Sequence, residues 1–237
     1  MVHLSGYLDL STAVLVARGK TRLIFQHEQL PGMLVKVLRP ELHSHDEPAA
    51  GALARFKRRV RPYRRLGAYR SIQREVREFL IFRSRCLKDP WPIAKIYGFV
   101  ETELGLALLT ERMTAPGGGL APTIETLLDE GRFQAQHRTA LHQFFDALEK
   151  YHICLCDLHT GNIVYVGDDK TTGRFVAVDG LGTRTLVPLR DWFPSLNARR
   201  TRRGASQVWS RIDQQLQREA SKTGAPPAAC PDAAQPV

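Results

Sequence analysis

Hydrophobic and polar residues alternate in several short segments of the chain, which is the pattern of half-buried β-strands. Successive side chains of a strand point to opposite faces of a sheet, so apolar and polar positions alternate. Turn residues separate neighbouring segments at Arg18-Gly19-Lys20, Leu30-Pro31-Gly32 and Glu103-Leu104-Gly105. We therefore expect a five-stranded antiparallel sheet. Its strands are 12–16, 21–25, 33–38, 96–100 and 106–109.

Two longer segments repeat apolar residues at the period of an amphipathic helix. The first covers residues 71–86 and the second covers 139–151. A short helix is expected at 123–129, and one or two helices between 185 and 221. The apolar positions are Ile72, Val76, Phe79, Leu80 and Phe82 in the first helix, and Leu141, Phe144, Phe145 and Leu148 in the second.

The flexible connection Pro116-Gly117-Gly118-Gly119 separates the strand-rich part of the chain from the helical part. We expect a first lobe at 1–112, with the five strands and the first helix. A reduced, mostly helical second lobe follows at 113–222, and residues 223–237, rich in Ala and Pro, form a disordered tail. Together these elements predict the α+β class.

Composition places the chain among soluble globular proteins. It has 237 residues, of which 43% are hydrophobic and 24% are charged. No apolar run approaches the roughly 20 residues that a membrane-spanning helix needs, and no secretory signal is visible at the start. The four cysteines have neither zinc-site nor disulfide-framework spacing. We therefore expect reduced thiols and a cytoplasmic protein.

The chain has net charge +10, and much of it lies in the run from Arg199 to Arg203 and in the stretch 55–65, which holds seven cations in eleven residues. Such a stretch could bind an anionic partner, but a solvated basic face is the alternative. We do not expect nucleic acid as a partner, because the sequence shows no reader helix or aromatic stacking motif. His43 and His45, which precede the stretch, are expected to be surface residues rather than metal ligands.

Two motifs in the second half carry the candidate chemistry. Asp157-Leu158-His159-Thr160-Gly161-Asn162 leads into an apolar strand, and Asp179-Gly180-Leu181-Gly182 follows another. They resemble the catalytic loop and the metal-binding loop of protein-kinase-like folds, where an Asp orients the acceptor and an Asn and a second Asp hold Mg²⁺. The alternative is that Asp157 and Asp179 only cap turns.

Lys36 is the lone charge inside the third expected strand. A buried cation needs a partner, and in kinase-like folds this Lys holds nucleotide phosphates and pairs with a helix Glu. We prefer Glu75 as the partner, with Glu78 as the alternative. Otherwise Lys36 faces outward and both glutamates are surface charges.

Several features depart from the protein-kinase pattern. The first turn offers only Gly19, which with Lys20 could form a shortened phosphate lid. Leu155-Cys156 replaces the usual His-Arg before Asp157, and the segment after Gly182 lacks an Ala-Pro-Glu motif. A peptide-docking platform is therefore doubtful. A small-molecule or lipid-derived acceptor becomes as plausible as a protein.

Taken together, the chain resembles the PhoP regulatory network protein YrbL family over roughly residues 10–220. This resemblance implies a protein-kinase-like bilobal fold and a regulatory association in bacteria more firmly than it implies a reaction. The matching motifs are Gly19-Lys20-x-Arg22-Leu23, Lys36-Val37, Tyr97-Gly98-x-Val100-Glu101-Thr102, Leu104-Gly105 and Asp179-Gly180-Leu181-Gly182.

The kinase-like motifs imply an ATP- and Mg²⁺-dependent phosphotransferase with an unknown acceptor. The alternative is a pseudokinase that senses nucleotide and transfers nothing. Asp157 would orient the acceptor, His159 would organise its loop, and Asn162 and Asp179 would hold metal. The nucleotide-binding residues would be Gly19, Lys20, Lys36 and Glu75, together with Glu111 and Met113 at the hinge.

Overall fold

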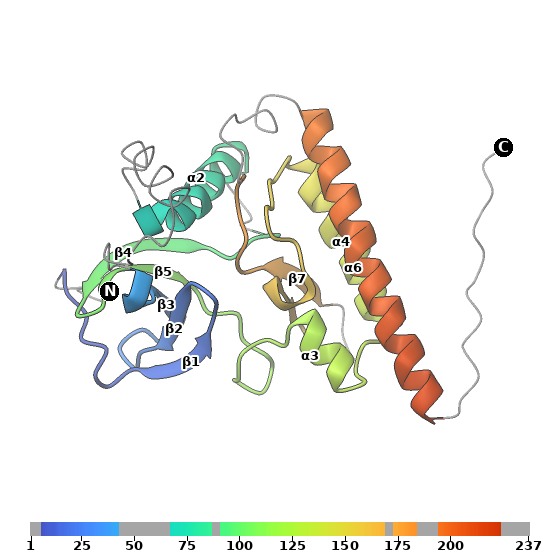
Figure 1. Cartoon of the computed structure of the whole chain (residues 1–237), viewed down its shortest axis with the longest axis horizontal. Coiled ribbons are helices and arrows are strands. Elements are labelled where there is room, and N and C mark those ends of the chain that lie inside the picture. The colour runs from blue at the N-terminus through green and yellow to red at the C-terminus, as the bar shows by residue number, and fades with distance from the viewer. Residues whose placement is uncertain (1–5, 43–66, 87–90, 169–172, 184–193, 224–237) are drawn as a thin grey trace, which may run out of the picture.

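The computed structural model describes residues 6–42, 67–86, 91–168, 173–183 and 194–223 (Figure 1). Five antiparallel strands form one sheet in the order β1-β2-β3-β5-β4, which confirms the α+β class and the predicted sheet. The third expected strand has the observed bounds, and the others differ by one or two residues. The strands are β1 (Val14–Arg18), β2 (Arg22–Gln26), β3 (Met33–Leu38), β4 (Ile96–Thr102) and β5 (Gly105–Glu111).

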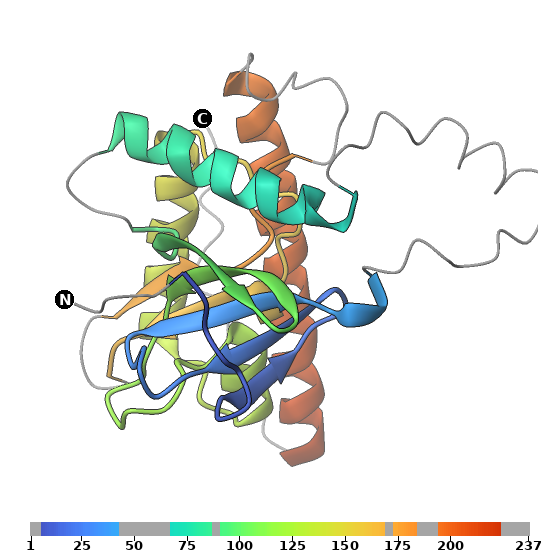
Figure 2. The ribbon, with the colours of Figure 1, turned by 90° about the vertical axis from the view of Figure 1, so that its left-hand side faces the viewer.

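Strand β3 is central and is covered on both faces. Val35 and Val37 point into an apolar cluster on one face, together with Leu109 of β5. On the other face Leu38 packs against Ile72 of α2 (Arg70–Arg85). Lys36 alternates with the valines and therefore lies on the α2 side of the sheet. Figure 2 shows α2 lying across this side.

Helix α2 buries polar as well as apolar side chains. Ile72 and Phe82 are buried, as the helical pattern predicts, and so are Glu75 and Glu78 on the same face. Leu80 was expected on this face but is 60% exposed. At 100° per residue Leu80 falls well outside the arc of the buried residues Ile72, Glu75, Glu78 and Phe82, on the solvent side of the helix, which accounts for its exposure.

The second half of the structure combines helices with a two-stranded hairpin. Its large apolar cluster includes the four predicted apolar residues of α4 and also takes in Phe82 of α2. Thr123 caps α3 by accepting a hydrogen bond from the Thr126 N–H. Helix α4 begins four residues earlier than expected, where His137 Nδ1 accepts a hydrogen bond from Gln134 N. The elements are α3 (Ile124–Asp129), α4 (Ala135–Lys150), β6 (Ile163–Val166) and β7 (Arg174–Ala177).

The last described element is one long helix, α6 (Pro194–Thr223), whereas the sequence predicted either one or two helices here. It lies beside α4 (Figures 1 and 2). Val208 and Ile212 fill the shared core, and Asn197 Nδ2 donates a hydrogen bond to the Ile153 carbonyl at 3.1 Å. None of the described helices is long and apolar enough to cross a membrane.

Three short 3₁₀ turns complete the described part of the chain: Pro40–Leu42, Gly67–Tyr69 and Thr160–Asn162. Of the described cysteines, Cys154 is buried, whereas Cys86 and Cys156 are partly buried. The basic stretch 55–65, His43, His45 and the tail from residue 224 lie outside the described residues.

Candidate functional site: two loops beside a buried charge cluster

Backbone hydrogen bonds join two loops of the structure. We call them the Asp157 loop (residues 154–162) and the Asp179 loop (residues 178–182). Cys156 N donates to the Gly180 carbonyl at 2.8 Å, and Gly182 N donates to the Cys154 carbonyl at 2.7 Å. Gly180 has φ of +80°, and a Cβ there would lie 2.7 Å from the Asp157 carbonyl oxygen. Only glycine allows this close approach.

The hairpin of β6 and β7 brings the two loops to the same end of the structure. Ile163 pairs with Ala177 at the open end of the hairpin. Beyond that pair, Val178 N donates to the Asn162 carbonyl at 3.0 Å. Asn162 therefore lies directly beside the strand end that carries Asp179.

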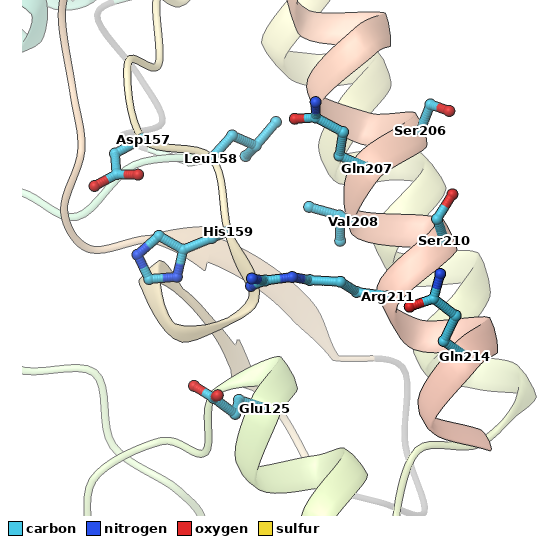
Figure 3. Close-up of a pocket in the computed structure, with 10 residues that line it drawn as sticks. All are labelled: Glu125, Asp157, Leu158, His159, Ser206, Gln207, Val208, Ser210, Arg211 and Gln214. Carbon is cyan, nitrogen blue, oxygen red and sulfur yellow. The ribbon is translucent and has the colours of Figure 1, made fainter. Parts of the chain in front are cut away.

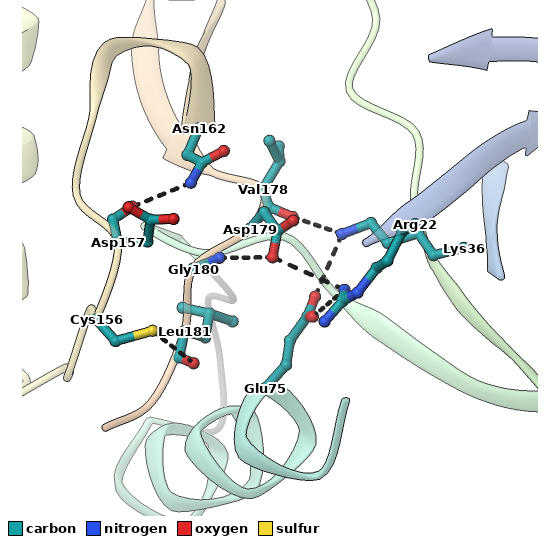
Figure 4. A network of polar contacts seen from close by, with 10 residues as sticks. All are labelled: Arg22, Lys36, Glu75, Cys156, Asp157, Asn162, Val178, Asp179, Gly180 and Leu181. Carbon is teal, nitrogen blue, oxygen red and sulfur yellow. Dashed lines mark hydrogen bonds and ion pairs between the residues drawn. The ribbon is translucent and has the colours of Figure 1, made fainter. Parts of the chain in front are cut away.

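Lys36 connects the sheet to the Asp179 loop. Only 3% of the residue is exposed, so the outward-facing alternative is wrong. Its Nζ lies 3.2 Å from Glu75 Oε1 and also donates a hydrogen bond to the Val178 carbonyl (Figure 4). Glu75, rather than Glu78, is therefore the partner of Lys36.

Glu78 has a different place in the structure. It is buried one turn along α2, where its carboxylate accepts a hydrogen bond from Cys154 N at 2.6 Å. The two glutamates thus join α2 to different neighbours, Glu75 to the sheet and Glu78 to the Asp157 loop. The surface-charge alternative for this pair is wrong.

Arg22 is the member of the cluster that sequence reasoning missed. It is 5% exposed, forms an ion pair with Glu75, and lies 3.7 Å from Asp179 Oδ1 (Figure 4). Ile24 pairs with Lys36 across β2 and β3, so Arg22, two residues from Ile24, shares the face of Lys36. The register of these two strands could therefore have identified Arg22 as a member of the cluster. Burial disfavours the charged guanidinium, but the carboxylates of Glu75 and Asp179 outweigh burial and raise the pKa of Arg22.

The Asp179 carboxylate faces this positive charge. Its side chain is 42% exposed, and Oδ1 accepts a hydrogen bond from Gly180 N at 2.6 Å. Burial acts to raise the pKa of Asp179, but the charges of Lys36 and Arg22 outweigh it and hold the pKa below its ordinary value. Asp179 is therefore ionised at neutral pH, as a metal ligand must be.

Replacing Lys36 by methionine will raise the pKa of Asp179, because Lys36 is the leading charge that lowers it. A carboxylate with a lowered pKa stabilises the fold above its unfolded-state pKa of about 3.9, and this contribution is lost as pH falls through the folded-state value. Carbon-13 titration of the Asp179 carboxyl group measures the shift. Arg39→Met, which removes a cation paired with Glu41 elsewhere, is the control. Equal Asp179 midpoints in wild type and Lys36→Met would contradict the assignment.

Asn162 and Asp157 are held by their own loop. Asn162 Nδ2 donates to the Asp157 carbonyl at 3.0 Å, which leaves the amide oxygen as the atom that could bind a cation. The Asp157 carboxylate points to the side on which Asp179 lies (Figure 4). His159 Nδ1 accepts a hydrogen bond from Gly161 N at 3.1 Å, a contact that organises the loop.

The donor set fits a hard divalent cation. A carboxylate from Asp179 and an amide oxygen from Asn162 are ligands that Mg²⁺ accepts, and Mg²⁺ usually keeps several waters and phosphate oxygens as well. The described residues contain no group of three or more His, Cys, Asp or Glu side chains placed to hold a metal ion. A metal here would therefore depend on water and phosphate for most of its ligands.

The remaining nucleotide-binding candidates lie outside this cluster. Gly19 and Lys20 are exposed in the β1–β2 turn, where Gly19 N donates to the Arg22 carbonyl at 2.8 Å. Glu111 ends β5 and accepts a hydrogen bond from Lys95 N at 3.1 Å. The Met113 carbonyl accepts one from Ala121 N at 2.9 Å. Both thus lie in the connection between the sheet and the helical part.

Comparison with models of protein families identifies the family of the chain. No curated protein matches the chain. The family model described as PhoP regulatory network protein YrbL matches residues 8–217, which is most of the chain and includes every residue of the cluster described above. The resemblance that the motifs indicated is thereby confirmed, and the chain belongs to the PhoP regulatory network protein YrbL family.

Proposed function

We propose that the protein is a Mg²⁺- and ATP-dependent phosphotransferase with a protein-kinase-like site between a strand-rich and a helical lobe. The observation that carries the proposal is the buried Lys36–Glu75 pair next to the ionised Asp179. A buried lysine held by a helix glutamate beside a metal-binding aspartate is the arrangement that phosphoryl transfer uses. The regulatory role that the family description names, and a cytoplasmic location, belong to the same proposal.

Each residue has one task in this proposal. Lys36 contacts the α- and β-phosphates, while Asp179 and Asn162 hold Mg²⁺, which neutralises phosphate charge when it is bound. Asp157 orients the acceptor hydroxyl, and His159 keeps the loop in shape. Glu75 and Arg22 position Lys36 and Asp179.

The reaction is a transfer of the γ-phosphoryl group. The acceptor oxygen forms a bond to the γ-phosphorus, and the bond from that phosphorus to the bridging oxygen of ADP breaks. ADP leaves with the electron pair of the broken bond, and Asp157 accepts the hydroxyl proton and passes it to solvent. Catalysis then rests on positioning and charge stabilisation.

A nucleotide-sensing module without turnover is the second candidate. Two observations favour it. The Gly19 N–H is used within its own turn, and Asp179 lies 3.7 Å from Arg22, a cation of the protein itself. Under this alternative nucleotide binding would change the contacts of Asp179 without transfer to an acceptor.

Mg²⁺ with ATP will raise the melting temperature of the wild-type protein more than ATP alone, because a ligand that binds only the folded state stabilises it by mass action. Asp179→Asn will abolish the metal-dependent part of the shift. Asp146→Asn, at an exposed position of α4, is the matched control and should behave as wild type. An unchanged metal-dependent shift in Asp179→Asn would rule out the metal assignment.

A further inference from the structure

A polar groove runs between the Asp157 loop and helix α6 (Figure 3). Its volume is about 780 Å³, which lies in the range of small-molecule sites. Asp157 and His159 line one wall, and Glu125 of α3 lies at its end. Figure 3 shows Arg211 reaching from α6 across the groove toward the Asp157 loop.

The α6 wall carries a cationic stripe, which we define as Arg200, Arg203, Gln207, Arg211 and Gln214. Steps of three and four residues place these side chains on one side of the helix. A smaller cavity of about 160 Å³ continues the groove, shares Asp157 and Gln207 with it, and adds Arg200 and Arg203 to its lining. The stripe contains no acidic residue.

The arginines of the stripe have no acidic partner in the part of the chain that the structure describes. Arg200, Arg203 and Arg211 form no ion pair with any residue that the structure describes, whereas their neighbour Arg202 binds Glu149 at 2.9 Å. A guanidinium presents a planar set of donors that matches phosphate and carboxylate groups. Three such groups next to Asp157 point to an anionic ligand.

The other residues that line the groove indicate which class of anionic ligand it can bind. Among the residues of the larger groove only Leu158 and Val208 are apolar. An acyl chain would find little apolar surface there, whereas serine and glutamine side chains suit hydroxyl groups. Asp157 can accept a hydrogen bond from a hydroxyl but repels an anion. The ligand should therefore carry its hydroxyl and its anionic group at different ends.

We propose that this groove is the acceptor site, and that it takes a small hydroxylated molecule bearing a phosphate or carboxylate group. The hydroxyl lies at Asp157 and the anionic group lies against the arginines of the stripe. The inference rests on the proposed phosphotransferase function, because it reads Asp157 as the group that faces the acceptor. It names a substrate class for that site.

Inorganic phosphate is the probe that tests the anion subsite. Titration into the nucleotide-free protein, followed by the arginine Nε–H signals in nitrogen-15 NMR, will give a saturable shift at Arg200, Arg203 and Arg211. An Arg203→Ala/Arg211→Ala double variant will weaken phosphate binding at least tenfold. Arg199→Ala, an exposed neighbour on the same helix that lines neither cavity, will bind as wild type. Shifts that do not saturate, or equal affinity in the double variant and the control, would overturn the proposal.

Two further arms separate the possible outcomes. The double variant must keep the full stabilisation by Mg²⁺ and ATP, since its residues lie outside the Lys36–Asp179 cluster. If the wild-type protein binds phosphate at the stripe but is not stabilised by Mg²⁺ and ATP, the groove is an anion site and not an acceptor site. Vesicles of phosphatidylglycerol present a phosphate and hydroxyls on a lipid. Vesicle binding that the double variant loses would contradict a free small molecule as the acceptor.

Discussion

An Asp157→Asn variant will bind Mg²⁺ and ATP as tightly as wild type, but it will form ADP at least about 10²-fold more slowly, the usual scale for loss of a positioned general base. Asparagine keeps the shape of the side chain and removes its charge and basicity. The side chain belongs to the Asp157 loop, and Asp179 lies between it and Lys36 (Figure 4). The nucleotide contacts should therefore survive. Calorimetric titration measures binding, and a coupled ADP assay measures turnover.

Two comparison variants make this result specific. Asp146→Asn removes an exposed carboxylate on α4 and should change neither quantity. Lys36→Ala should weaken nucleotide binding itself, because it removes a phosphate contact. Glu75 keeps an ion-pair partner in Lys36→Ala, because Arg22 still contacts its carboxylate. If wild type binds ATP and forms no more ADP than Asp157→Asn, the catalytic assignment is wrong and the nucleotide-sensing alternative stands.

Glu75→Ala will lower the free energy of unfolding by about 3–5 kcal/mol, the cost typical of removing one partner from a buried ion pair. Glu75 contacts two buried cations, Lys36 and Arg22. Without the carboxylate, these two buried positive charges lose the negative charge that they share. Urea denaturation followed by circular dichroism measures the loss.

Two further variants test whether charge is the cause. Glu41→Ala removes a mostly exposed carboxylate paired with Arg39, and should cost no more than about 1 kcal/mol. A triple variant with Arg22→Met, Lys36→Met and Glu75→Leu should recover most of the stability lost in Glu75→Ala, because it removes the buried charges together. An equal loss in Glu75→Ala and Glu41→Ala would contradict the buried cluster.

The sequence was most informative where local pattern and buried environment agree. The strand that contains Lys36 could be predicted because both of its faces are buried. Its valines and leucines therefore surround a single charged residue. The amphipathic pattern likewise located α4, but it missed the first turn. That turn is set by a hydrogen bond between His137 and Gln134, which apolar periodicity does not report.

The site could be predicted only in part, because its contacts join segments far apart in the chain. Helical spacing places Glu75 and Glu78 on one face, so only the packing of α2 decides which of them meets Lys36. The motif that contains Arg22 does not show that its side chain is buried beside Lys36, because that position follows from strand register. The basic run from Arg199 to Arg203 is visible in the sequence, but only the structure shows that the stripe of α6 lies beside the Asp157 loop.

A crystal structure of the protein with Mn²⁺ and a non-hydrolysable ATP analogue will show whether Lys36 contacts nucleotide and Asp179 binds metal. We predict phosphates in contact with Lys36, the metal bound by the Asp179 carboxylate and the Asn162 amide oxygen, and the γ-phosphate facing Asp157. Nucleotide bound away from Lys36, or a metal ion without contact to Asp179, would contradict it.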